Sequence, residues 1–302
     1  MLAPASRCLT AGTDQEPSPL IETSYMIRIA FIIISTEEKP WSEIHRIGQV
    51  PTWLAGLHAE ETYLCAYSTG SEGQSWISKT DHRRIEYGRH ANKSFSIREP
   101  ALTNAHHAYF DAVNGYGSLI TCTLSAMNYL VQHFQRDYIV RTNVSSYWNL
   151  PRLRSFLQTA PRTNFYAGLP RRIYSGIRGR FNRTKYATGA GMIVSVDVAT
   201  NFVKHHKTFS NTLIDDMAFG LQAKRLKLDL TPLNRLDLET YPAAQACAIA
   251  KLTETFHVRC KSYINPGDYL QRDDVKIMHF IHSRITGSSP NNSAPPPAPH
   301  SL

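Results

Sequence analysis

Several features that would assign a protein to a class at once are missing from this sequence of 302 residues. Its five cysteines are widely spaced and never form a CxxC pair, which argues against a disulfide framework and a structural zinc site. The longest apolar run, residues 29–34, is far shorter than the roughly 20 residues that cross a bilayer. Neither GxGxxG nor GxxxxGK[ST] occurs, so the two commonest phosphate-binding loops are absent.

Acidic residues are missing from one long interval. Residues 138–196 contain no Asp or Glu but ten Arg or Lys residues, whereas the whole chain has a net charge of only +9. All the excess positive charge therefore lies in this basic block. A field of one sign attracts oppositely charged ligands, so the block favours nucleic acid, an anionic membrane face or a phosphate-bearing substrate, or else it serves only solubility.

The two ends of the chain differ in composition from the centre. Residues 1–25 carry three acidic residues among Pro and Ser and lack the pattern of a secretory signal, and residues 286–302 are rich in Ser, Asn and Pro. We expect disordered tails at 1–25 and 286–302 around one domain at 26–285. With reduced cysteines and no membrane helix, the sequence favours a cytoplasmic protein and leaves peripheral contact with a membrane open.

Strand and helix patterns alternate along the central part. The isoleucine-rich residues 26–35 are typical of a parallel strand covered on both faces. Asn149 and Ser195 are expected to cap the helices that follow them. This alternation predicts an α/β fold with a mostly parallel central sheet flanked by helices. We expect further strands at 62–67, 137–142, 186–194 and 256–262, and helices at 41–57 with a break at Pro51, 119–134, 149–157, 196–206, 215–225 and 275–285.

Polar side chains follow the predicted strands where each one ends, and ligands of parallel sheets gather at those ends. Ser35 and Thr36 follow the first strand, and residues 67–70 follow the second. Three further segments are candidates for chemistry: the end of the strand at 137–142, a glycine-punctuated strand, and adjacent acids on a helix. Their candidate site residues are Arg141, Thr142, Asn143, Ser145 and Ser146, then Gly189, Ala190 and Gly191, then Asp215 and Asp216.

The order and spacing of these segments, with GAGMIVS at 189–195 and DDMAFG at 215–220, resemble the nucleotide-sugar glycosyltransferases of the GT-A fold. The similarity is to the β-1,3-galactosyltransferase and Fringe-like group. It implies a GT-A-like, Rossmann-related domain that moves a sugar from a nucleotide-diphosphate donor, UDP-linked by analogy, to a hydroxyl of a glycan or related acceptor, with inversion. By the same resemblance, Asp216 is the general base, and residues 189–191 with Asp215 form the acceptor loop.

The sequence departs from that family at the metal motif. Where the family places an acidic triplet, this chain has Asn143, Val144 and Ser145, whose neutral groups cannot offset the charge of a hard dication. We therefore do not expect a strong manganese or magnesium site. One arginine guanidinium can bind two phosphate oxygens at once. Arg141 is therefore the best-placed substitute for a metal ion, and we expect Arg259 and Lys261, on a later strand, to face the same phosphates.

Other interpretations stay open at this point. One alternative is a degenerate transferase that only binds nucleotide or glycan. Another is a basic nucleic-acid-binding protein, although nucleic acid is not the partner that we expect. In the alternative to a general base, Asp215 or Asp216 only caps the helix that begins there. The histidine pairs, among them His106 and His107, lack acidic or Cys partners at a zinc-like spacing, so we expect them at the surface or on helices.

Overall fold

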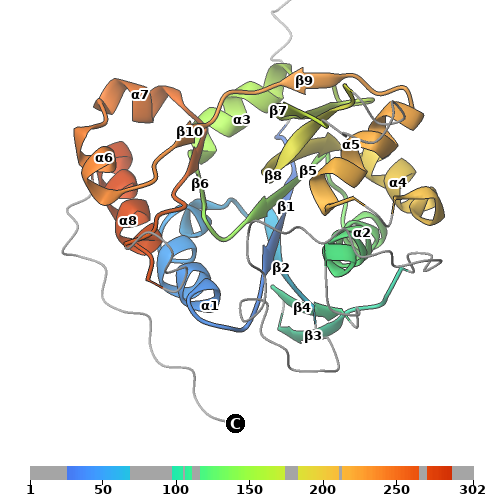
Figure 1. The fold of residues 1–302 in the computed structure, drawn as a ribbon, viewed down its shortest axis with the longest axis horizontal. Coiled ribbons are helices and arrows are strands. Elements are labelled where there is room, and N and C mark those ends of the chain that lie inside the picture. The colour runs from blue at the N-terminus through green and yellow to red at the C-terminus, as the bar shows by residue number, and fades with distance from the viewer. Residues whose placement is uncertain are drawn as a thin grey trace, which may run out of the picture.

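The computed structural model describes residues 26–68, 97–104, 106–110, 116–173, 183–210, 213–264 and 271–287. Within these ranges the chain forms an eight-stranded sheet and a smaller three-stranded sheet, with helices on both faces of the large one (Figure 1). The predicted tail at 1–25 and most of the one at 286–302 lie outside the described residues. Thr286 still belongs to the last helix, so that helix ends one residue later than predicted.

The large sheet runs in the order β3-β4-β2-β1-β5-β8-β7-β9. Four of its pairings are parallel and three are antiparallel, which confirms a mostly parallel sheet in an α/β fold. Its strands are β1 (Ile29–Ser35), β2 (Thr62–Ser68), β3 (Ala101–Asn104), β4 (His107–Phe110), β5 (Tyr138–Asn143), β7 (Tyr166–Arg172), β8 (Lys185–Ser195) and β9 (Leu230–Pro232).

Strand β1 lies at the centre because it is apolar on both faces. Phe31 and Ile33 pack into one hydrophobic core, and Ala30 and Ile32 pack into the other, as the alternation of side chains along a strand requires. Burial on both faces is typical of strands in parallel sheets that helices cover on each side.

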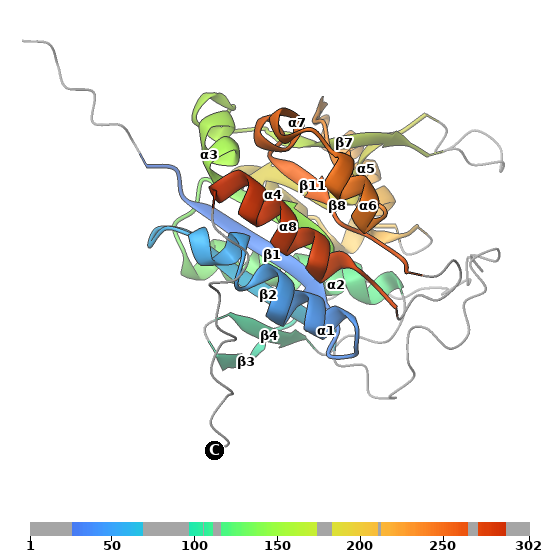
Figure 2. The same ribbon diagram turned by 90° about the vertical axis from the view of Figure 1, so that its left-hand side faces the viewer.

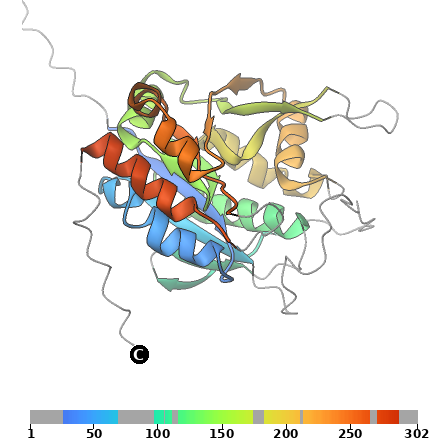
Figure 3. The ribbon, with the colours of Figure 1, turned by 60° about the vertical axis from the view of Figure 1, so that its left-hand side comes forward.

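Different sets of helices cover the two faces of the large sheet (Figure 2). The first core is covered by α1 (Trp41–Glu43) with the π-helical turn η1 (Ile44–Gln49), the 3₁₀ turn η2 (Trp53–Gly56), α3 (Leu150–Thr159) and α8 (Asp274–Thr286), and α8 packs along η1 (Figure 3). The second is covered by α2 (Tyr116–His133), α4 (Val196–Lys204), which the 3₁₀ turn η3 (His206–Thr208) follows, and α5 (Asp215–Arg225). The predicted break at Pro51 is confirmed, because it lies between η1 and η2.

The small sheet joins the end of β5 to the late part of the chain. Its order is β10-β11-β6, with β6 (Ser146–Trp148), β10 (Leu236–Asp237) and β11 (His257–Arg259), and α6 (Tyr241–Ala246) and α7 (Ile249–Glu254) lie between the last two strands. In the pairing of β11 with β6, Arg259 lies opposite Ser146. The late strand predicted at 256–262 is therefore shorter than expected and belongs to this second sheet.

The predicted capping is right in position but wrong in chemistry. Asn149 and Ser195 occupy the N-cap positions of α3 and α4, yet neither side chain makes the capping hydrogen bond. Ser195 Oγ instead accepts a hydrogen bond from the Phe165 amide at 3.0 Å, which ties the start of β7 to the end of β8.

Candidate functional site

Three of the predicted segments meet beside strand β8. The guanidinium of Arg141, on β5, forms a buried ion pair with Asp215 at the start of α5. The amide of Gly189, on β8, donates a hydrogen bond of 3.0 Å to Oδ2 of Asp216. A side chain at Gly189 would place its Cβ 2.6 Å from Nη1 of Arg141, so any residue other than glycine would displace the guanidinium. Arg141, Gly189, Asp215 and Asp216 are thus brought together; we call them the Asp216 cluster.

The two adjacent aspartates have different environments. Asp215 neutralises Arg141, whereas both oxygens of Asp216 accept backbone amides, from Gly189 and, at 2.8 Å, from Met217. The N-cap residue of α5 is Ile214, so neither aspartate occupies the capping position. Burial raises the pKa of Asp216 to about 6, with a second contribution from the charge of Asp215. A fixed carboxylate whose pKa lies near neutrality has the property of a general base.

The polar end of β5 is hydrogen-bonded within itself. Oδ1 of Asn143 accepts the Ser145 amide at 3.2 Å and lies 3.1 Å from Oγ of Ser146. The hydroxyls of Thr142 and Ser146 lie 2.8 and 2.9 Å from the carbonyl of Ala190. These contacts hold the turn after β5 against β8. The predicted role of these side chains in binding a donor stays a prediction.

Two buried side chains close the space behind that turn. The His257 ring stacks on Trp148 at 4.0 Å, and its Nε2 lies 3.2 Å from the Ser146 hydroxyl. At Gly191 a Cβ would come within 2.2 Å of the His257 ring. Gly189 therefore leaves room for the Arg141 side chain, and Gly191 leaves room for the His257 ring.

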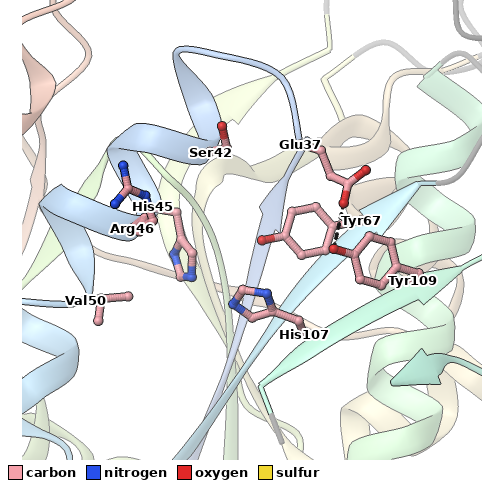
Figure 4. A pocket seen from close by; sticks show the side chains of 8 residues that line it. All are labelled: Glu37, Ser42, His45, Arg46, Val50, Tyr67, His107 and Tyr109. Atoms are coloured by element: carbon pink, nitrogen blue, oxygen red, sulfur yellow. Dashed lines mark hydrogen bonds between the residues drawn. The ribbon is translucent and has the colours of Figure 1, made fainter. Parts of the chain in front are cut away.

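A cavity of about 260 Å³ lies beside the carboxyl ends of β1 and β2 (Figure 4). The rings of Tyr67 and Tyr109 stack at 4.8 Å, and the Tyr109 hydroxyl donates to Glu37 at 2.7 Å. Opposite them, His45 and His107 face each other with ring centroids 5.6 Å apart. We call this space the β1 cavity; Ser42, Arg46 and Val50 complete its lining.

Sequence reasoning did not find this cavity. His107 lies on the strand β4 and not on a helix, and its half-buried side chain lines the β1 cavity. The available signal was the polar stretch predicted to follow the second strand, which begins at Tyr67. Ser35 and Thr36, at the end of β1, hydrogen-bond to their own neighbours, the Thr36 carbonyl and the Glu38 amide.

A second cavity, of about 390 Å³, is lined by residues on and around the small sheet. Arg259 and Lys261 both line it, together with Asp237, Glu239, Thr240 and Tyr263. Arg235 connects it to β8, because its guanidinium binds both oxygens of Asp237 and donates to the Thr188 hydroxyl at 2.8 Å. Burial, and then the charge of Arg235, lower the pKa of Arg259. We call this space the β11 cavity.

Gln49 links the β1 cavity to the turn after β5. Its amide nitrogen donates to the carbonyls of Asn143 and Ser146, each at 3.1 Å, and its Oε1 lies 3.0 Å from Nδ1 of His45. Contacts thus run from His45 through Gln49 to Ser146, and from there through Ala190 to Gly189 and Asp216. Asn143, Ser146, residues 189–190 and Asp216 thus belong to one connected polar network, although neither cavity is lined by Asn143 or Asp216.

Several arginines of the basic block already have acidic partners. Besides the Arg141 pair, Arg154 binds Glu61, and Arg162 lies 3.6 Å from Asp137. Arg178 and Arg180 lie outside the described residues. The block is therefore not a uniform surface of unpaired charge over the part of the chain that the structure describes.

Two further observations concern only the residues that the structure describes. Among the described residues, no three or more His, Cys, Asp or Glu side chains are grouped so that they could hold a metal ion. None of the helices within the described ranges has the length and apolarity to cross a membrane.

Comparison of the sequence with protein-family models and with curated proteins gives no match. The resemblance to GT-A glycosyltransferases therefore stays a prediction.

Proposed function

We propose that the protein transfers a sugar from a nucleotide-diphosphate donor to a hydroxyl of a glycan or related acceptor, with inversion and with Asp216 as the base. One observation carries the proposal: Asp216, with a pKa of about 6, is held by two backbone amides where β5, β8 and α5 meet. An inverting displacement needs one carboxylate that accepts the proton of the attacking hydroxyl.

The fixed orientation of Asp216 supports that role. Each of its oxygens accepts one backbone hydrogen bond, and a carboxylate has about four acceptor positions, so positions remain for an acceptor hydroxyl. Its pKa leaves the carboxylate ionised at neutral pH and still basic enough to take a proton as the bond to the sugar forms.

The phosphates of the donor need positive charge, and the structure changes which residues we assign to them. Arg141 is buried and its charge is neutralised by Asp215, so it is no longer the best candidate. Arg259 and Lys261 both line the β11 cavity, which Arg235 connects to Thr188, the residue before Gly189. We therefore assign the diphosphate to these two residues and the nucleoside to the β1 cavity, next to Ser35 and Thr36.

The test is a panel of nucleotide sugars, assayed for transfer and hydrolysis with and without manganese. We expect turnover by the parent protein and at least a 100-fold lower rate for Asp216→Asn, since a positioned base contributes about 10² to 10⁴ to the rate. Asp229→Asn, an exposed aspartate outside the cluster, is the control and should keep the parent rate. Equal rates in all three proteins would remove Asp216 as the base.

A binding protein without chemistry is the second candidate, and the turn after β5 favours it. Asn143, Val144 and Ser145 stand where the family has its acidic triplet, and Oδ1 of Asn143 accepts hydrogen bonds from the Ser145 amide and the Ser146 hydroxyl. Such a protein would be stabilised against heat by UDP and would show no turnover with any donor. The same panel therefore separates the two candidates.

A further inference from the structure

The outer end of the β7–β8 hairpin carries positive charge that the rest of the fold does not neutralise. Four exposed basic residues lie there, at the end of β7 and around the start of β8: Arg171, Arg172, Arg183 and Lys185. A fifth is the exposed Lys224 of α5, whose ammonium lies 3.5 Å from the hydroxyl of Thr184. Among the described residues, none of the five has an acidic partner within ion-pair distance. We call these five residues the basic hairpin.

The pairing of the two strands places like charges against each other. Arg172 lies directly opposite Lys185 in the antiparallel register, so the two side chains stand on the same face of the sheet. Like charges directly opposite on neighbouring strands destabilise the pairing. The fold therefore keeps an unfavourable contact, which an anionic partner would turn into a favourable one.

Positive charge lies on both faces of this hairpin. Arg171 precedes Arg172 along β7 and lies opposite the buried Tyr186, so its side chain stands on the other face. Figure 2 shows β7 running out to the edge of the molecule. A projecting hairpin with charge on both faces can place all of that charge among the headgroups of a lipid layer, whereas a nucleic-acid duplex would lie along one face only.

The basic block offers little for stacking on nucleic-acid bases. Four of its aromatic side chains are buried: Tyr147, Trp148, Phe165 and Tyr166. Single-stranded nucleic acid is bound by exposed aromatic rings on which successive bases stack. Within the described residues, none of the large exposed apolar side chains belongs to the hairpin either. The basic hairpin is therefore suited to contact through charge alone.

We propose that the basic hairpin docks the protein onto an anionic lipid membrane. Its occupant is a headgroup layer that contains an acidic phospholipid, because such a layer attracts basic clusters through its negative surface potential. This attraction falls off within a Debye length, so the docking is sensitive to salt. The inference goes beyond the proposed function and does not depend on it, since it uses neither Asp216 nor either cavity.

Co-sedimentation of the full chain with phosphatidylcholine vesicles, with and without phosphatidylserine, tests the proposal. We expect binding only where phosphatidylserine is present, and loss of that binding at about 1 M salt, where the Debye length is about 3 Å. Arg172→Gln combined with Lys185→Gln should weaken the binding roughly 30-fold, because each basic residue near an anionic surface contributes about fivefold. Removing two opposed like charges should leave the protein at least as stable in urea denaturation, so lost binding would not reflect unfolding.

A second double variant controls for net charge. Lys251→Gln combined with Arg284→Gln removes the same charge from exposed positions on α7 and α8, and it should bind the vesicles as the parent does. Equal weakening in the two double variants, or no binding of the parent to anionic vesicles, would overturn the proposal. Duplex DNA at the same phosphate concentration should not displace the protein from the vesicles, and displacement would assign the surface to nucleic acid instead. Either failure leaves the proposed function standing.

Discussion

Replacing Asp216 by Asn should change the stability of the protein in opposite directions at low and high pH. The pKa of Asp216 is raised from 3.8 to about 6, chiefly by burial, so the folded state holds this proton more tightly than the unfolded chain does. Stability from this group is therefore fully present below pH 3.8 and is lost as the pH rises through about 6. An asparagine has no such proton, so the variant lacks this loss.

The magnitude follows from the two pKa values. A rise from 3.8 to about 6 corresponds to roughly 3 kcal/mol of folding free energy lost once the carboxyl is ionised. Asn keeps one acceptor oxygen and turns an N–H group toward the other backbone amide, which costs about 1 kcal/mol. We expect Asp216→Asn to be less stable than the parent by under about 1 kcal/mol at pH 4, where the parent has already lost a small part of this contribution, and about 2 kcal/mol more stable at pH 8.

Urea denaturation of both proteins at pH 4 and pH 8, at matched ionic strength, measures these differences. Asp229→Asn, at an exposed position, should differ from the parent by the same small amount at both pH values. A difference between Asp216→Asn and the parent that does not change with pH would refute burial as the cause of the raised pKa. A gain in stability with a loss of activity is the pattern expected where a site holds a group in an unfavourable environment for its chemistry.

Two further changes test the packing around the cluster. Gly191→Ala should cost about 1–3 kcal/mol in urea denaturation, because its Cβ would overlap the buried His257 ring, whereas Gly56→Ala, with 3.5 Å to its nearest neighbour, should be tolerated. Arg141→Met should cost about 3–5 kcal/mol because it leaves Asp215 as a buried charge without its partner, and adding Asp215→Asn should restore part of the loss. Additive effects in that double variant would contradict the pairing.

Much of the central fold could be predicted from hydrophobic pattern alone. The strand at 26–35 is predicted by its run of isoleucines, and the helix at 215–225 by its helical periodicity. Both signals come from residues that are close together in the sequence. Strand β7 was missed because its sequence, YAGLPRR, contains the glycine and proline that signal a break. Its pairing with β8 shifts register between Gly168 and Pro170, and a Cβ at Gly168 would lie 2.5 Å from that of Ala187. The contact between β7 and β8 therefore explains Gly168, whereas the local sequence pattern predicts a turn there.

The candidate site was predictable only in part, for a related reason. The polar residues after the strand at 137–142 marked the position of Asn143, because ligands of parallel sheets gather at the carboxyl ends of the strands. Asp216 lies at the start of a helix, and only the resemblance to GT-A glycosyltransferases pointed to it. The partner of Arg141 could not be read from the sequence, since Asp215 is 74 residues away along the chain. Likewise, His45 lies in a π-helical turn with no sequence motif of its own, and only the packing against Gln49 and β4 shows what its ring faces.

The three small residues 189–191 couple Asp216 to the rest of the network. The Gly189 amide binds Asp216, the Ala190 carbonyl accepts the hydroxyls of Thr142 and Ser146, and Gly191 makes room for His257. Gly189→Ala therefore has an effect that differs from overpacking of a core. Its Cβ meets the far end of the Arg141 side chain, so the guanidinium must shift within its pair with Asp215. Gly189→Ala should therefore be less stable than the parent, by less than the cost of Arg141→Met, and should still fold.

That movement would change the charge near Asp216. The positive charge of Arg141 lowers the pKa of Asp216, so a guanidinium pushed away from the cluster lets that pKa rise above about 6. The pH at which the parent loses the stability due to Asp216 should then move upward in Gly189→Ala, and urea denaturation between pH 4 and pH 8 follows it without any assay of activity. In Gly189→Ala combined with Asp216→Asn this loss should be absent. A loss at the parent pH in Gly189→Ala would mean that Arg141 has no electrostatic influence on the proposed base.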